Sequence, residues 1–128
     1  MSNFTIQNLL QLEETTSARN PGVEGRFGRT ALGTAHLGLS HFRYAPNYRP
    51  TSGHRHREQE ELYIVLSGSG RVRLDDEIRE IGPWDVVRVA PGTVRALAAG
   101  PDGLEFLAIA SDRPEGGDGE MIRDWWVE

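Results

Sequence analysis

Two histidines and several acidic residues lie close together near the middle of the sequence. His54 and His56 are two residues apart, so in an extended segment their side chains point to the same face. Imidazoles placed in this way can both reach one metal ion. A carboxylate on the next strand, where Glu60 and Glu61 lie, could supply a third ligand. Two histidines and one carboxylate suit iron(II) with open coordination positions, and zinc, manganese and nickel accept the same set.

The residues around this group leave the ligand set partly open. Glu60 lies one residue out of register with Glu61, so strand alternation places its carboxylate on the opposite face, unless a bulge exchanges the two. Tyr63 has the same parity as Glu61 and is expected to line the same face. The alternative is that residues 53–61 form a solvated, charge-rich turn that binds no metal.

Short strands are expected to position these residues. Fifteen glycines and seven prolines divide the chain into short segments, which favours strands over long helices. Such strands, separated by turn signals, indicate an all-β sandwich or barrel. Residues 5–14 are predicted to form a helix with Thr5 as its N-cap, and residues 15–28 a loop or extended arm. The strands are predicted at 37–41, 61–66, 71–74, 78–81, 86–89, 94–99 and 104–110, with turns at 67–70 and 100–103.

The composition excludes several kinds of chemistry. The 128 residues include 19 acidic residues and 14 basic residues, all of them arginine, and no cysteine. The absence of lysine rules out Schiff-base catalysis, and the absence of cysteine rules out thiolate metal sites and cysteine nucleophiles. A net charge of -5 argues against nucleic-acid binding. No apolar run approaches the roughly 18–20 residues of a membrane helix, and no signal peptide is evident, so a cytoplasmic protein is expected.

Residues 53–97 resemble the cupin superfamily in two motifs. Gly53-His54-x-His56-x4-Glu61-x6-Gly68 is similar to the first conserved cupin motif, and residues 84–95 are similar to a degraded second motif. The resemblance implies a small cupin-type double-stranded β-helix, or jelly-roll barrel, with a pocket inside it.

The resemblance also assigns roles to individual residues. It implies that His54, His56 and Glu61 take the positions of metal ligands. Arg95 stands where a cupin places a histidine as the fourth ligand, and Trp84 replaces the glycine that leads the second motif. Arginine remains protonated and is not a normal metal ligand.

The chain is expected to form one domain with three parts. Residues 1–29 are predicted to be an N-terminal arm with a short helix, residues 30–110 the cupin barrel, and residues 111–128 a C-terminal tail. The tail begins with a flexible acidic, glycine-rich stretch and ends in a segment with two adjacent tryptophans, which we expect to pack on the barrel or on a partner chain. Small cupins commonly dimerise, so the resemblance implies a homodimer.

Arg95 leaves three interpretations of the site open. In the first, the three ligands still hold a divalent metal, and Arg95 turns aside or binds an anionic ligand. In the second, no metal binds and Arg95 pairs with Glu61. In the third, His36 or His41 replaces the missing ligand, because His41 shares a face with its apolar strand neighbours and could point into the barrel.

Two functions follow from these interpretations. The first is a small-molecule-binding cupin, with or without a divalent metal ion, whose ligand-binding residues are Arg95, Tyr63 and His41. Arg95 would then grip a carboxylate, and the ligand would be a sugar or a carboxylate-bearing molecule. The second is a metal-dependent enzyme of the dioxygenase or isomerase type, in which iron, manganese, zinc or nickel is held by the three predicted ligands.

Overall fold

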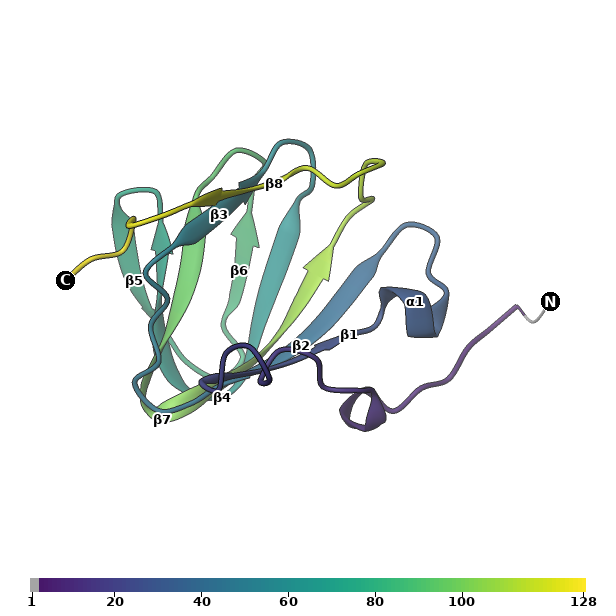
Figure 1. Ribbon diagram of the computed structural model, residues 1–128, viewed down its shortest axis with the longest axis horizontal. Helices are drawn as coiled ribbons and strands as arrows, with labels where there is room; N and C mark the ends of the chain where they lie inside the picture. Colours follow the sequence, from purple (N-terminus) through teal and green to yellow (C-terminus); the bar gives the residue numbers. More distant parts are fainter. Residues whose placement is uncertain (1–2) are drawn as a thin grey trace.

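The chain forms a strongly curled sheet of eight strands, as a computed structural model that describes residues 3–128 shows (Figure 1). The predicted all-β, cupin-type jelly-roll fold is confirmed. Only short helical segments accompany the strands. The elements in chain order are η1 (Leu9–Gln11), β1 (Val23–Phe27), α1 (Arg29–Leu32), β2 (Gly38–Tyr44), β3 (Gly53–His56), β4 (Glu61–Leu74), β5 (Glu77–Ile81), β6 (Val86–Val89), β7 (Arg95–Ala110) and β8 (Gly119–Ile122).

Two long antiparallel strands, β4 and β7, are the centre of the fold. They pair with each other along most of their length, β4 also pairs with β5 and β6, and β7 also pairs with β2 and β3. The turns predicted at 67–70 and 100–103 are wrong, because the strands continue through both segments with shifts in register. Gly68 has a φ of 86°, and a Cβ atom there would lie 2.1 Å from the carbonyl oxygen of Gly103. Glycine at these positions therefore bends both strands together instead of reversing them.

The sheet extends on both sides of residues 30–110. Strand β1, in the segment expected to be a loop or extended arm, pairs with β2, and β8 in the C-terminal segment pairs with β3. Trp126, beyond β8, is buried and packs against Ala96 and Ala98. The C-terminal segment is thus packed on the chain's own sheet.

The predicted helix over residues 5–14 is wrong. Within this range, only Leu9–Gln11 form a 3-10 helix, and Asn8 rather than Thr5 caps it. Ile6 is 85% exposed and Leu10 is 50% exposed, so the segment buries no apolar face. A short helix without such packing is only marginally stable.

The main core fills the space between the curled halves of the sheet. Inward-facing residues of β4 and β7 alternate with outward-facing ones, as strand geometry requires. The fully buried members of this core include Val65, Val72, Val89 and Phe106. None of the helices among residues 3–128 is long and apolar enough to cross a membrane.

Trp84 occupies a backbone conformation that favours glycine. It has a φ of 70° in a turn closed by a hydrogen bond from the N–H of Asp85 to the carbonyl of Gly82. This explains why the related motif has glycine at this position. The indole itself is 76% exposed.

Replacing Trp84 with glycine is expected to stabilise the chain by about 0.5–1 kcal/mol, because it removes the cost of the left-handed conformation. Urea unfolding followed by circular dichroism measures the change. Trp84→Ala is the matched control, since alanine removes the indole but keeps the backbone penalty. The explanation fails if the glycine variant is no more stable than the alanine variant.

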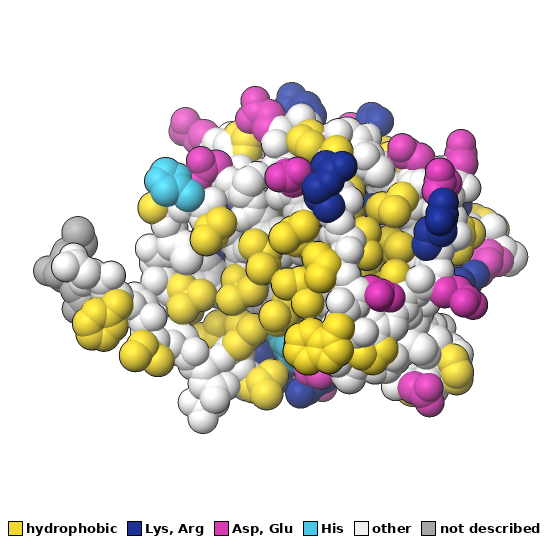
Figure 2. Space-filling model, turned by 180° about the vertical axis from the view of Figure 1, so that it is seen from behind, with side chains coloured by type: hydrophobic (Ala, Val, Ile, Leu, Met, Phe, Trp, Pro, Cys, Tyr) yellow, Lys and Arg dark blue, Asp and Glu magenta, His cyan; other side chains and the backbone are white. Residues whose placement is uncertain are grey.

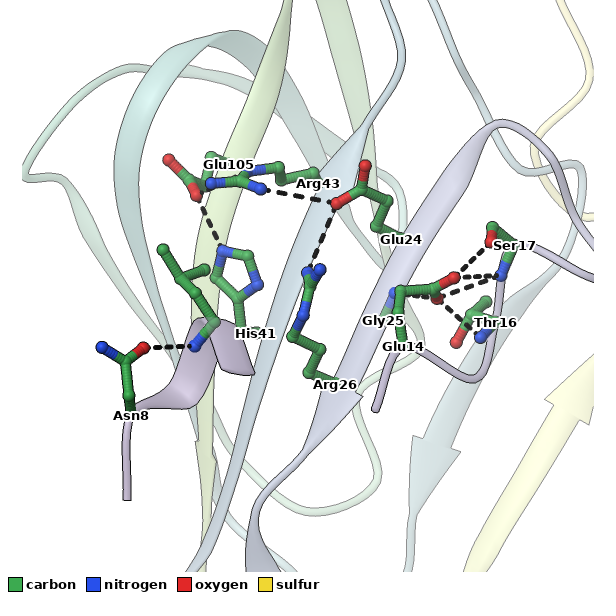
Figure 3. A network of polar contacts seen from close by, with 11 residues as sticks. Asn8, Glu14, Thr16, Ser17, Glu24, Gly25, Arg26, His41, Arg43 and Glu105 are labelled. Atoms are coloured by element: carbon green, nitrogen blue, oxygen red, sulfur yellow. Dashed lines mark hydrogen bonds and ion pairs between the residues drawn. The ribbon is translucent and has the colours of Figure 1, made fainter. Parts of the chain in front are cut away.

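Glu14 holds the chain segment that precedes β1. Its carboxylate accepts hydrogen bonds from the backbone N–H groups of Thr16 (2.7 Å) and Gly25 (2.8 Å), and from the hydroxyl of Ser17 (Figure 3). The Gly25 N–H, followed by the Ser17 hydroxyl, favours the ionised form most strongly, and the pKa of Glu14 falls to about 2.

This lowered pKa predicts a contribution of Glu14 to acid stability. Because the pKa of Glu14 in the folded chain lies below the ordinary value of 4.5, its contribution is complete above that pH and is lost as the pH falls towards 2. Glu14→Gln is expected to lower the urea midpoint at pH 7 and to reduce the drop in midpoint between pH 7 and pH 3. Glu13→Gln, at an exposed neighbour, should behave like the wild type. Identical midpoints for Glu14→Gln and the wild type at pH 7 would disprove the role.

Candidate metal centre

Strand β3 and the start of β4 bring the two histidines and Glu61 together. The Nε2 atoms of His54 and His56 each lie 3.6 Å from Oε1 of Glu61. Ligand atoms of all three residues lie within 4.8 Å of one another, a spacing that one metal ion can bridge. The side chain of His54 is 44% exposed, whereas those of His56 and Glu61 are 17% and 13% exposed. The predicted group therefore forms a partly enclosed cluster with one open side at His54.

The alternation predicted for the two neighbouring glutamates is present in the structure. Glu60 points away from the cluster, and its carboxylate forms an exposed ion pair with Arg88 at 3.4 Å. Glu61 faces inward, where it also accepts a hydrogen bond from the hydroxyl of Tyr63 at 2.9 Å. Tyr63 thus lies beside the cluster on the same strand face.

Arg95 is buried behind Glu61 and does not face a ligand. Its side chain is fully buried, and one terminal nitrogen donates to Oε1 of Glu61. Nε donates to the hydroxyl of Tyr63 at 3.2 Å, and the other terminal nitrogen donates to the carbonyl of Thr93 at 3.1 Å. All three nitrogens already have protein acceptors. The expectation that Arg95 grips a ligand carboxylate is therefore not supported by its position, whereas its pairing with Glu61 is observed.

The surroundings of Glu61 favour the carboxylate form. Burial raises the pKa of Glu61, but the nearby His54 imidazole and the Arg95 guanidinium outweigh burial and hold the pKa at about 2. Burial also raises the pKa of the Tyr63 phenol, which stays protonated and can donate to Glu61. The cluster thus contains a carboxylate fixed in its ionised, metal-binding form.

Asp118 orients His56 and was missed by sequence reasoning. Its buried carboxylate lies 2.8 Å from Nδ1 of His56 and accepts hydrogen bonds from the backbone N–H groups of Glu58 (2.6 Å) and Gln59 (2.9 Å). Burial raises the pKa of Asp118, but the two backbone donors outweigh it and lower the pKa to about 2. An ionised Asp118 accepts a hydrogen bond from Nδ1–H of His56, which keeps the imidazole proton on Nδ1 and leaves a free lone pair on Nε2, on the Glu61 side.

The C-terminal segment positions Asp118 through sheet pairing. Strand β8 pairs with β3, so that Gly119 lies opposite His56, and Asp118 precedes this pair (Figure 1). The stretch 111–120 was interpreted as flexible because of its acidic, glycine-rich composition, yet Asp118 is only 5% exposed. An acid among glycines just before a strand was the available signal, but composition alone did not show what the acid contacts.

His41 and His36 lie away from the cluster. His41 is buried, and its Nε2 lies 2.7 Å from the Glu105 carboxylate, which also accepts a hydrogen bond from Arg43 (Figure 3). Ser40 and Phe42, the neighbours of His41 on β2, line a pocket inside the curled sheet. Because side chains alternate along a strand, His41 points to the outer face of the sheet. His36 is exposed and lies 3.0 Å from Asp112. The structure therefore brings neither histidine to the predicted fourth ligand position.

A pocket of about 280 Å³ opens beside the cluster. His54, Glu61 and Tyr63 form part of its wall, so a metal held by the cluster would face the pocket. Most of the remaining wall is apolar or aromatic. The residues that line the pocket are Phe27, Ser40, Phe42, Tyr44, Pro50, Ser52, Gly53, His54, Glu61, Tyr63, Ala96, Leu97, Phe106, Ala108 and Met121.

The family assignment agrees with the fold and the position of the cluster. The family model of the cupin domain matches residues 40–110, more than half of the chain. The chain is a cupin. No curated protein matches this cupin closely enough to be named as a relative.

Solved structures of cupins and enzymes share the fold. KdgF from a Halomonas species is 18% identical with a TM-score of 0.71, over 91% of this chain and 98% of that one. The polyketide cyclase RemF from Streptomyces resistomycificus is 25% identical with a TM-score of 0.72, over 97% and 87% of the two chains. The Streptomyces protein Pac13, a nucleoside dehydratase, is 16% identical with a TM-score of 0.70, over 96% and 92%.

Proposed function

We propose that this cupin is a metal-dependent enzyme that binds a divalent ion through His54, His56 and Glu61 and acts on a small molecule in the adjoining pocket. The observation that carries the proposal is the convergence of these three donors beside the pocket, with His54 and Glu61 in its wall. Two imidazoles and a carboxylate are a suitable donor set for a divalent transition metal and leave coordination positions open. Neighbouring structures with the same fold include a cyclase and a dehydratase, which supports an enzymatic role.

The protein's own residues prepare the site for this role. Asp118 keeps the Nε2 lone pair of His56 free, and Arg95 and Tyr63 hold the Glu61 carboxylate through hydrogen bonds to Oε1. When bound, a divalent ion would act as a Lewis acid towards an oxygen of the substrate.

Titration with Co²⁺ tests this proposal, because protein-bound Co²⁺ has visible absorption bands that report its ligands. We expect bands that saturate at one equivalent and that disappear in His54→Ala and in His56→Ala. His36→Ala is the matched control and should retain the bands, since His36 is exposed and distant from the cluster. The absence of saturable bands in the wild type would disprove the metal site.

A second function is favoured by the ion pair between Arg95 and Glu61. Because Arg95 balances the charge of Glu61, the cluster is also compatible with a metal-free, small-molecule-binding cupin. In that case the midpoint temperature of thermal unfolding of the chelator-treated protein should rise when a pocket ligand is added. It should not change when divalent ions are added. A midpoint that rises on addition of Zn²⁺, and no longer does so in His56→Ala, would instead support the enzyme.

We also propose that the cupin is a homodimer, because an apolar outer sheet face and an unpaired arm complement each other. Outward-facing residues of four strands form the apolar face, and Leu62 lies opposite Ile109 and Ile64 opposite Leu107 in the sheet. Figure 2 shows hydrophobic side chains gathered on the face of the molecule seen from behind. We define the outer face as Leu39, Leu62, Ile64, Val86, Leu107 and Ile109.

The N-terminal arm supplies the matching surface from a second copy. Residues 3–8 are exposed throughout and project from the body (Figure 1). Phe4 and Ile6, 73% and 85% exposed, alternate with polar residues as in a strand that is half-buried. Reciprocal exchange of the arms by a two-fold axis would cover both arms and both outer faces, whereas a single chain leaves both uncovered.

Sedimentation of the full chain tests the dimer. The wild type should sediment as a dimer, and the double variant Phe4→Ser with Ile6→Ser should dissociate at concentrations at least about tenfold higher, because it loses two buried apolar side chains per arm. Val86→Glu on the outer face should act in the same way. Ile78→Glu, at an exposed apolar residue of β5 outside the outer face, should leave the dimer intact. A monomeric wild type, or equal effects of Val86→Glu and Ile78→Glu, would overturn the proposal.

A further inference from the structure

The pocket beside the cluster has aromatic walls in a connected arrangement. The rings of Phe42 and Phe106 stack with centroids 5.3 Å apart and planes at 27°. Tyr44 meets Phe106 edge-on at 5.1 Å, and Phe27 meets Phe42 edge-on at 5.6 Å. These rings come from β1, β2 and β7, so three strands contribute to one aromatic surface. Flat conjugated ligands pack well against such surfaces, either stacked or edge-to-face.

The pocket wall contains few groups that can carry a charge. Among the described residues that line the pocket, Glu61 is the sole carboxylate and His54 the sole imidazole, and neither arginine nor lysine is present. Arg95, which balances the charge of Glu61, is buried behind it. The wall therefore has no arginine or lysine to pair with a phosphate or a ligand carboxylate, and its other hydrogen-bonding side chains are the neutral Ser40, Tyr44, Ser52 and Tyr63. Without a metal ion, this argues against the carboxylate ligand expected from the sequence.

The metal cluster adds one further requirement on the ligand. Glu61 and Arg95 cancel in charge, so a bound divalent ion would leave the cluster with a positive charge that favours an ionisable oxygen. The pocket volume of about 280 Å³ is at the small end of the range for ligand sites. The ligand thus needs a compact, largely apolar body and an oxygen that faces the cluster.

We propose that the pocket binds a flat, conjugated molecule of about two fused rings that turns a phenol or enol oxygen towards His54 and Glu61. The preference for a conjugated body rests on the aromatic walls alone. The placement of the oxygen rests on the proposed function, because it needs the metal ion.

Calorimetric titration with two matched alcohols tests the aromatic preference. 2-Naphthol and decahydro-2-naphthol have the same heavy-atom skeleton, but only the first is flat and conjugated. In the presence of a chelator, the wild type should bind 2-naphthol at least about tenfold more tightly than its saturated counterpart. Equal affinities for the two alcohols would overturn the proposal.

Variants of the pocket show whether the preference arises at the aromatic walls. Phe42→Leu should reduce the preference for 2-naphthol to less than about threefold, because a stacking ring is lost. Phe27→Leu, at a residue 53% exposed at the pocket edge, should act in the same direction with little effect on folding. Trp84→Leu removes an exposed aromatic ring outside the pocket and should leave the preference unchanged. An unchanged preference in both pocket variants would overturn the assignment to this pocket.

A comparison with and without Zn²⁺ separates the two parts of the proposal. Zn²⁺ should tighten the binding of 2-naphthol at least about fivefold and leave the binding of naphthalene unchanged, because naphthalene has no oxygen to face the ion. If Zn²⁺ binds but affects both molecules equally, the placement of the oxygen is overturned. If Zn²⁺ does not bind, the proposed function fails, and the placement of the oxygen fails with it. The preference for a conjugated ligand is then still tested by the binding of 2-naphthol in the presence of chelator.

Discussion

Replacement of Arg95 with methionine is expected to destabilise the metal-free cupin by about 3 kcal/mol. Methionine has a similar volume but cannot donate to Glu61, to the Tyr63 hydroxyl or to the carbonyl of Thr93. The Glu61 carboxylate would then lie half-enclosed with no balancing charge. Urea unfolding of chelator-treated protein at pH 7 measures the change in the free energy of unfolding.

Two further variants separate the loss of charge balance from general damage to the core. Adding Glu61→Gln to Arg95→Met should recover at least about half of the lost stability, because it removes the unbalanced charge. Arg88→Met breaks an exposed pair with Glu60 and should cost no more than about 0.5 kcal/mol. A loss for Arg95→Met as small as that for Arg88→Met would mean that Arg95 does not support Glu61.

Replacement of Asp118 with asparagine is expected to weaken metal binding by about 10- to 100-fold. Asparagine keeps the volume, and its carbonyl oxygen can still accept from the N–H groups of Glu58 and Gln59. Its amide group would instead donate to Nδ1 of His56, which moves the imidazole proton to Nε2 and removes the lone pair needed by the metal. Competition for Zn²⁺ with a chromophoric chelator measures the affinity.

Asp112→Asn provides a matched control for this prediction. Asp112 also contacts a histidine, since its carboxylate lies 3.0 Å from Nδ1 of His36, but that pair is exposed and distant from the cluster. The control variant should bind Zn²⁺ as tightly as the wild type. If Asp118→Asn also binds Zn²⁺ with unchanged affinity, the hydrogen bond from His56 to Asp118 has no role in preparing the site.

The local part of the site could be predicted from the sequence because strand geometry has a strict period. The shared face of His54 and His56, and the opposite faces of Glu60 and Glu61, depend only on alternation within short segments, whereas the choice of Glu61 came from the resemblance to the cupin motif. The position of Arg95 in the second motif was also predicted, and so was its alternative pairing with Glu61. The direction of the Arg95 side chain could not be predicted, because only the packed sheet shows that the guanidinium lies against the Glu61 carboxylate.

The remaining features depend on contacts between distant segments. Asp118 reaches His56 through the pairing of β8 with β3, and nothing near position 118 reveals that pairing. For His41, the parity with its apolar neighbours was predicted, but period two does not show which face of the sheet is inside. The glycines at 68 and 103 were interpreted as turns because bends and reversals use the same residue for the same backbone reason.

The metal content of protein purified without chelators or a histidine tag tests the central claim most directly. We predict about one equivalent of a divalent transition metal per chain, reduced to background in His56→Ala and retained in His36→Ala. Elemental analysis by mass spectrometry gives both the amount and the identity of the metal. A wild-type protein that contains no metal, and that takes up neither iron, manganese, zinc nor nickel on dialysis, would contradict the account.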